Sequence, residues 1–213
     1  MENYKAIVGS RSYGLEIKNS DYDIITTEQT ILNSSLPNSH YIKLSKEDFL
    51  KMLLLLDNNC FGIQYFFPYM VLEESNISKY ILEKREEILA ANLDRIYTAY
   101  MRKADGLSTD LDKWYKKFPK RPAYSCLFYD TLYRYASKNI SFQEAFKPEE
   151  NFRQWLLDIR YGKIPLEDIL RVNKELKTKA ENVKNFYIGR EDKVVLNKVV
   201  EDLNELLETN IKI

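Results

Sequence analysis

The sequence predicts an α+β protein in which a small mixed sheet with helices is followed by an all-helical C-terminal region. Short apolar runs that are bounded by turn residues, the pattern of strands, are confined to residues before about 72. From Ser75 onward, charged and apolar residues recur at helical spacing. We therefore expect a sheet-containing core over residues 1–74 and a helical domain over residues 75–213 that packs on this core.

The first two strands are predicted on either side of a turn-rich connection. Tyr4–Val8 is an apolar run that stops at Gly9 and Ser10, and Tyr22–Thr26 is rich in β-branched residues. The connection between them contains Gly14 and other turn residues. These features predict two strands that are neighbours in the sequence.

A helix and a third strand are predicted next. Ser45 and Asp48 have the spacing of a capping box, and the apolar periodicity of Phe49–Leu56 then predicts a helix. Phe61–Phe67 is rich in aromatic residues and ends at Pro68, which predicts a strand. The N-terminal part is therefore expected to be mixed α/β.

The rest of the chain is predicted to be helical, with breaks near glycine and proline residues. The breaks lie near Gly106, Pro119, Pro122, Pro148 and Gly162. The expected helices cover Ile77–Arg102, Thr109–Phe118, Ala123–Ser137, Glu149–Tyr161, Leu166–Val183 and Glu191–Leu207.

Composition favours a soluble cytoplasmic protein. Basic and acidic residues both number 32, so net charge does not draw the chain to nucleic acid or to a membrane, and any nucleic-acid contact must be local. The apolar stretches Met52–Leu56 and Tyr65–Leu72 are far shorter than the roughly 20 residues of a membrane span. Cys60 and Cys126 lack metal-ligand spacing, which predicts buried, reduced thiols.

The residues that carry chemistry lie between Gly9 and Ile24. In a strand, residues two apart face the same side, so Asp21 and Asp23 are expected to project together. Two carboxylates provide oxygen ligands for Mg²⁺ or Mn²⁺, and such ions bind triphosphate oxygens. Gly9 lets a phosphate approach the backbone, and the Ser10 hydroxyl can donate a hydrogen bond. The segment therefore predicts a nucleoside-triphosphate and metal site.

The order of these features resembles the signature of the DNA polymerase β nucleotidyltransferase superfamily. GSRSYGL followed by SDYDI is similar to the bacterial and phage RNA-ligase-associated predicted nucleotidyltransferases, and a less specific similarity extends over most of the chain. This resemblance implies a polymerase β-like core, with Asp21 and Asp23 as catalytic metal ligands. It also implies transfer of a nucleoside monophosphate to a hydroxyl of an RNA end, a protein side chain or a small molecule, with release of pyrophosphate.

One position departs from that family. Gln64 stands where the resemblance places a third acidic catalytic residue. A glutamine can offer a carbonyl oxygen to a metal ion, but it cannot neutralise the ion or accept a proton from the attacking hydroxyl. Asp57, Glu73 and Glu74 are alternative sources of a carboxylate, and each also fits a solvated loop charge.

Three functional hypotheses therefore remain open. The first is an active nucleotidyltransferase. The second is a protein that kept the fold but lost catalysis, and that binds nucleotide or nucleic acid as a sensor or partner-binding module; Gln64 favours it. The third is a purely structural helical scaffold, for which neither Asp21 nor Asp23 would affect ligand binding.

Further residues are candidates for holding the nucleotide. The resemblance includes Arg11, which is suited to bind a triphosphate, whereas Lys18 fits a surface position. Tyr13 can either stack on a base or pack the loop. His40, the single histidine, is predicted to lie in a loop.

A second group of candidates lies in the helical region. Residues 113–121 interleave basic and aromatic side chains, a composition that can hold phosphates and stack bases, and that also fits the solvated face of a helix. Within this segment, Lys120 and Arg121 are the candidates for closing over the nucleotide.

Overall fold

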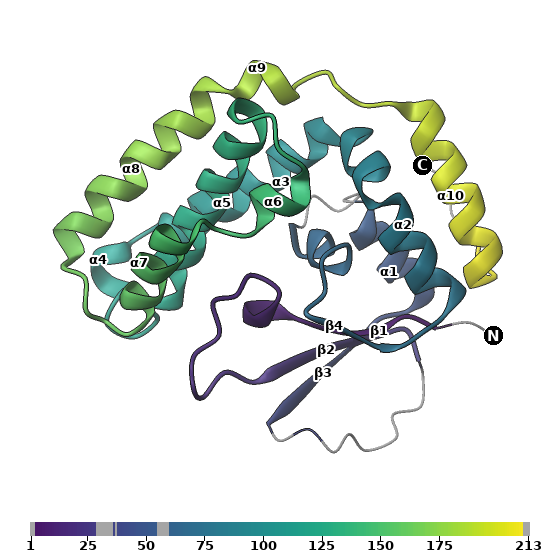
Figure 1. Cartoon of the computed structure of the whole chain (residues 1–213), viewed down its shortest axis with the longest axis horizontal. Coiled ribbons are helices and arrows are strands. Elements are labelled where there is room, and N and C mark those ends of the chain that lie inside the picture. The colour runs from purple at the N-terminus through teal and green to yellow at the C-terminus, as the bar shows by residue number, and fades with distance from the viewer. Residues whose placement is uncertain (1–2, 29–35, 37, 55–59, 211–213) are drawn as a thin grey trace. The chain divides into compact units, whose positions relative to one another are not determined.

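The computed structural model describes residues 3–28, 36, 38–54 and 60–210, apart from the side chains of Cys60 and Phe61 (Figure 1). It confirms the α+β class, because a sheet is followed by a helical region. The chain divides into two compact units, residues 1–95 together with 191–213, and residues 96–190. The division differs from the expected boundary at residue 74. Helical segments that come before and after the second unit in the sequence belong to the same unit as the sheet.

A mixed sheet forms the base of the first unit. Its four described strands have the order β3-β2-β1-β4. β1 is antiparallel to both β2 and β4, whereas β2 and β3 are parallel. The strands are β1 (Lys5–Val8), β2 (Tyr22–Thr26), β3 (Ser39–Lys43) and β4 (Met70–Glu73). The first two strands were predicted, and β3 and β4 were not.

The predicted strand at Phe61–Phe67 is wrong. The structure has a 3₁₀ helix there, η2 (Cys60–Tyr65). A Cβ atom on Gly62 would overlap the backbone carbonyl oxygen of Met52, so η2 approaches the preceding helix more closely than a side chain would allow. The apolar character of the run reflects its burial against that helix, and a buried run of this length has no period that separates strand from helix.

The helices of the first unit are α1 (Lys46–Leu53), α2 (Asn76–Ala90) and α10 (Lys193–Leu207). Ser45 caps α1 as predicted, because its side chain accepts a hydrogen bond of 3.0 Å from the Asp48 amide. α10, near the end of the chain, packs against α2 and α1 (Figure 1). This contact explains why the last segment belongs to the sheet-containing unit.

One predicted helix is interrupted. Ile77–Arg102 was expected to be continuous, but α2 ends at Ala90 and α3 (Leu93–Ser108) begins two residues after Ala91. The side chain of the intervening residue, Asn92, is buried and donates a hydrogen bond of 2.8 Å to the carbonyl oxygen of Leu54. An asparagine side chain that donates a hydrogen bond to a distant backbone carbonyl favours an interruption of the helix at that residue.

The second unit is helical, and α5 lies at its centre. α5 packs against α4, α6, α7 and α8. These helices are α4 (Leu111–Trp114), α5 (Lys120–Ser137), α6 (Phe142–Phe146), α7 (Glu150–Arg160) and α8 (Leu166–Asn182), followed by α9 (Lys184–Tyr187). The predictions for α5, α7, α8 and α10 are confirmed to within a few residues, that for Thr109–Phe118 is too long, and α6 and α9 were not predicted.

Two composition-based predictions can be compared with the described residues. No helix within the described ranges is long and apolar enough to cross a membrane. Cys126 is a buried free thiol, as expected, and burial raises its pKa to about 12. The side chain of Cys60 lies outside the described part of the chain.

Candidate functional site

The site is built around the contact between Gly9 and Asp23. Gly9 follows β1 with a φ of +79°, and Asp23 lies opposite Val8 in the antiparallel β1–β2 pair. A Cβ atom on Gly9 would overlap Oδ2 of Asp23 and lie 3.0 Å from its Cγ. The left-handed backbone favours glycine at this position, and a larger residue would also displace the Asp23 carboxylate that lies against it.

Gln64 is the third member of this cluster. Its side chain is buried, and Oε1 accepts a hydrogen bond of 2.7 Å from the Gly9 amide. Gln64 thus lies at the loop after β1, next to the glycine that contacts Asp23. The glutamine carbonyl already binds the backbone, which reduces its capacity to act as a metal ligand.

An aromatic cluster of Tyr4, Phe49 and Tyr65 fixes η2, and with it Gln64. The Tyr65 ring stacks on Phe49 at a centroid distance of 5.4 Å, and Phe49 packs on Tyr4 at 4.8 Å. The Tyr4 hydroxyl donates a hydrogen bond of 2.7 Å to the carbonyl oxygen of Tyr65. Burial raises the pKa of Tyr4, so this hydroxyl stays protonated and remains a donor.

The cluster opens into a pocket of about 310 Å³. Gly9, Asp23, His40 and Gln64 form its polar part. The apolar part is formed by Val8, Ile25, Ile42, Met52 and Tyr65. Ligand pockets in proteins commonly measure about 300–1,000 Å³, so this one suits part of a nucleotide rather than a whole triphosphate.

His40 lies beside Asp23 in this pocket. The two residues are register partners in the parallel β2–β3 pair, and Nδ1 of His40 lies 3.7 Å from Oδ1 of Asp23. The imidazole is 68% exposed, whereas the Asp23 side chain is 28% exposed. The predicted loop position of His40 is wrong, because β3 includes it.

Asp21 is placed differently from Asp23. β2 begins at Tyr22, so Asp21 stands just before the strand, where it is exposed. It is not among the residues that line the pocket. The two aspartates are thus close in sequence, but they have different surroundings.

The turn after β1 carries the other predicted loop residues. Ser10 lies within a short 3₁₀ helix, η1 (Gly9–Arg11), and is nearly buried. The Tyr13 ring is only 2% exposed, which fits packing within the loop better than stacking on a base. Burial of Tyr13 and Leu15 holds the turn against the first unit.

Arg11 is engaged within the same connection. Its guanidinium lies over the Tyr22 ring at 3.8 Å from the centroid, and Nη2 donates a hydrogen bond of 3.2 Å to the carbonyl oxygen of Ser20. Arg11 therefore joins the two ends of the loop that contains Ser10 and Tyr13. If Arg11 binds phosphate, it must do so through guanidinium N–H groups that are not used in these contacts.

Lys120 and Arg121 belong to the second compact unit. Lys120 is exposed at the start of α5, and Nη2 of Arg121 donates a hydrogen bond of 2.9 Å to the carbonyl oxygen of Gly106 near the end of α3. Neither residue is among those that line the pocket at Asp23.

The alternative sources of a third carboxylate do not line the pocket either. Glu73 is exposed on β4, and Glu74 is exposed in the connection that follows. Asp57 lies outside the described residues. Within the described ranges there is no group of three or more histidine, cysteine, aspartate or glutamate side chains that could hold a metal ion.

These donors fit one metal ion better than two. Proteins commonly bind Mg²⁺ through one or two carboxylates together with substrate phosphates. Asp23 is partly exposed in the pocket, whereas Asp21 is exposed just before β2 and does not line it, so the described residues bring one carboxylate to the pocket. A pair of ions would need another carboxylate, and the neutral Gln64 side chain does not provide one.

The sequence did not predict the apolar wall of the pocket or the position of His40 in it. The wall residues come from β1, β2, β3, α1 and η2, and only the folded sheet brings them together. No protein-family profile matches the chain, and searches of curated proteins and of solved structures give no significant match.

Proposed function

We propose that the protein is a Mg²⁺-dependent nucleotidyltransferase that transfers a nucleoside monophosphate from a triphosphate to a hydroxyl acceptor and releases pyrophosphate. The acceptor is an RNA end, a protein side chain or a small molecule. The observation that carries the proposal is the contact of the Asp23 carboxylate with Gly9 at the rim of a pocket. Both residues belong to the segment that resembles polymerase β-type nucleotidyltransferases.

The residues have distinct roles in this proposal. Asp23, with Asp21, would hold the metal ion, which supplies positive charge to the phosphates during transfer. Gly9 has no Cβ atom, so it leaves room for the Asp23 carboxylate against the backbone. Gln64 fixes the position of the Gly9 amide by accepting its hydrogen bond. The apolar wall, which includes Ile25 and Met52, would exclude water from one side of the bound nucleotide.

A second candidate function is metal-dependent nucleotide binding without turnover. It is favoured by Gln64, which is neutral and accepts a hydrogen bond from Gly9. In this case the protein would bind nucleotide as a sensor or a partner-binding module. The two candidates share a binding site and differ in whether the bound triphosphate reacts.

An assay of pyrophosphate release separates the candidates. The protein is incubated with each nucleoside triphosphate and Mg²⁺ together with total RNA, total cell protein or a small-molecule cell extract, each in turn, and nucleotide binding is measured in parallel. Asp23→Ala is compared with Glu73→Ala, because Glu73 is an exposed carboxylate of the same sheet that does not line the pocket. A unit charge pair at 4 Å is worth about 4 kcal/mol at an effective dielectric near 20, which corresponds to roughly a thousandfold.

For the enzyme, we expect pyrophosphate release that falls by about this factor in Asp23→Ala and is unchanged in Glu73→Ala. Binding that depends on Asp23 without any release would support the second candidate. If neither binding nor release depends on Asp23, both proposals fail.

A further inference from the structure

The second compact unit contains a separate pocket of about 480 Å³. Its lining comes from α4 and the segment that follows, and from the turn between α7 and α8. The Tyr115 hydroxyl donates a hydrogen bond of 2.9 Å to the carbonyl oxygen of Ile164, which ties these two segments together. Gly162, with a φ of +70°, turns the chain after α7 and leaves Arg160 and Tyr161 at the pocket.

Arg160 has unsatisfied donors at this pocket. Its Nε and Nη1 atoms are both buried and have no hydrogen-bond partner. Within the described residues the side chain also forms no ion pair, although it lines the pocket together with Lys116 and Asp112. Buried donors on a charged group that lack a partner are costly, and native proteins pair almost all of them.

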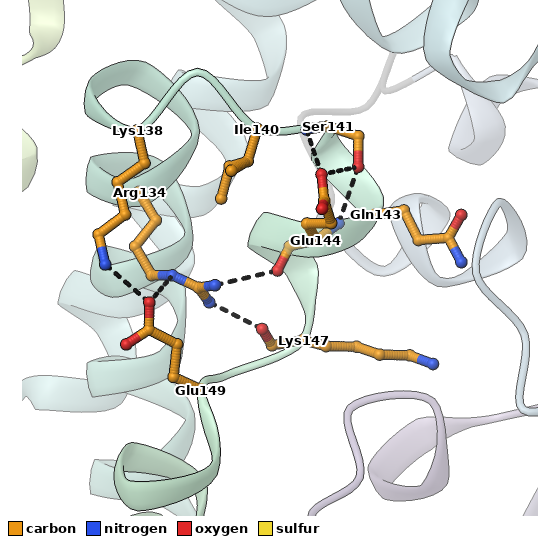
Figure 2. A pocket seen from close by; sticks show the side chains of 8 residues that line it. All are labelled: Arg134, Lys138, Ile140, Ser141, Gln143, Glu144, Lys147 and Glu149. Carbon is orange, nitrogen blue, oxygen red and sulfur yellow. Dashed lines mark hydrogen bonds and ion pairs between the residues drawn. The ribbon is translucent and has the colours of Figure 1, made fainter.

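Arg134, a structural arginine of the same unit, has hydrogen-bond partners for both Nη atoms, although its Nε, like that of Arg160, is buried without one. Its guanidinium donates to the carbonyl oxygens of Lys147 at 2.7 Å and Glu144 at 3.2 Å, and Nε lies 3.7 Å from the Glu149 carboxylate (Figure 2). These contacts join α5 to the end of α6. Arg160 differs from Arg134 in that its Nη1 atom is also buried without a partner and its guanidinium forms no ion pair among the described residues, so a similar structural role does not explain it.

The side chains near Arg160 match a phosphorylated nucleotide. Lys116 is an exposed cation in the lining, and Asp112 is an exposed carboxylate there, so the basic groups exceed the acidic one. The Tyr161 side chain is 53% exposed, and the Lys163 ammonium lies 5.3 Å from its ring centroid. A guanidinium recognises phosphate oxygens, and an exposed aromatic ring can stack on a base.

We propose that this pocket binds the phosphate group of a nucleotide, either free or at the 5′ end of an RNA strand. Arg160 donates to the phosphate oxygens, Lys116 adds positive charge, and Tyr161 stacks on the attached base. The proposal lies within the second unit and does not depend on the function proposed for the pocket at Asp23.

The binding test uses two pairs of probes that differ only in the phosphate. The first pair is adenosine monophosphate and adenosine, and the second is a short single-stranded RNA with and without a 5′-phosphate. Binding is measured by calorimetry with EDTA present and with Asp23→Ala as the background, so that metal-dependent binding at the first pocket does not contribute. Arg160→Gln is compared with Arg153→Gln, which lies on the same helix in an exposed ion pair with Glu150.

We expect the phosphorylated member of at least one pair to bind at least tenfold more tightly than its counterpart. Arg160→Gln should lower that affinity at least tenfold, and Arg153→Gln should change it less than twofold. Asp112→Asn should increase it, because a carboxylate in the lining is lost. The pair that responds identifies the source of the phosphate. Equal affinity within both pairs, or no effect of Arg160→Gln, would overturn the proposal.

Thermal unfolding distinguishes a binding residue from a structural one. Because Arg160 has no internal partners, Arg160→Gln should leave the unfolding temperature unchanged or raise it, whereas Arg134→Gln should lower it by several degrees. Saturating adenosine monophosphate or 5′-phosphorylated RNA should raise the unfolding temperature of the wild type and not that of Arg160→Gln. A destabilisation by Arg160→Gln as large as that by Arg134→Gln would assign Arg160 a structural role and contradict the proposal.

Discussion

The substitution Gly9→Ala tests the contact on which the candidate site is built. Alanine at a φ of +79° costs about 1–2 kcal/mol in backbone strain. The new Cβ atom would also overlap Oδ2 of Asp23, and overpacking of this kind typically adds about 1–3 kcal/mol. We therefore expect a total loss of about 2–5 kcal/mol in the free energy of unfolding.

A double-mutant cycle with Asp23→Ala separates the two terms. In the Asp23→Ala background the carboxylate is absent, and the Cβ atom of residue 23 remains at 3.1 Å from the new atom. Gly9→Ala should then cost mainly the backbone strain of about 1–2 kcal/mol, because the severe overlap is gone and only a tight contact with this Cβ atom remains. The cycle should accordingly give a coupling energy of about 1–3 kcal/mol, because contacting residues are not additive.

The assay must report on the first unit. Both tryptophans, Trp114 and Trp155, lie in the second unit, so their fluorescence would not report on β1 and β2 directly. Amide hydrogen exchange of peptides that cover β1 and β2 measures the opening free energy of this part of the sheet. Additivity within about 0.5 kcal/mol would refute the inferred contact between Gly9 and Asp23.

Three further predictions concern the second unit. Burial raises the pKa of Asp130 from 3.8 to about 6, only partly opposed by Arg134, so the folded state retains a proton that the unfolded chain releases. The stability should therefore fall as the pH rises from about 4 to about 6. Asp130→Asn should remove this fall and raise the free energy of unfolding at pH 8 by an amount on the order of 2–3 kcal/mol, which is measured as a higher urea midpoint. A lower midpoint would contradict this prediction. Asn173 is buried, and its side-chain amide donates a hydrogen bond of 2.8 Å to the Ser125 hydroxyl. Asn173→Ala should therefore lower the free energy of unfolding in urea by about 1–3 kcal/mol, whereas the substitution of exposed Lys174 by alanine should be neutral. Equal effects of the two substitutions would argue against this hydrogen bond. The buried thiol of Cys126, with its pKa raised to about 12, should resist iodoacetamide at pH 8 until the protein is unfolded, and rapid labelling of its peptide in the native state would disprove its burial.

The sequence predicts the fold well where a pattern has a clear period or a clear boundary. Tyr4–Val8 stops at Gly9, and Tyr22–Thr26 is rich in β-branched residues and follows a turn-rich connection; a strand forms in each. Phe61–Phe67 has no such period, since its consecutive residues from Ile63 to Phe67 are all buried, and a 3₁₀ helix forms where a strand was predicted. Proximity of Gly62 to the Met52 backbone depends on tertiary packing, which local propensity does not describe.

The candidate site is predictable where its parts are local. Gly9 and Asp23 come from adjacent strands joined by one turn, so a Gly-Ser pair followed by Asp-x-Asp suffices to bring them together. His40 reaches Asp23 through a parallel pairing of β2 with β3, whose connection spans residues 27–38. The position of Gln64 depends on η2 and on the aromatic cluster of Tyr4, Phe49 and Tyr65 that packs against it. Such long-range placements leave no periodic signal in the sequence.

The most direct test of the proposed nucleotide site is calorimetric titration with a non-hydrolysable nucleoside triphosphate and Mg²⁺. The wild type and Glu73→Ala should bind with the same affinity, and binding should require Mg²⁺. Asp23→Ala, which removes the carboxylate that lies against Gly9, should weaken binding by roughly a hundredfold or more. Equal binding by Asp23→Ala and the wild type would contradict the account.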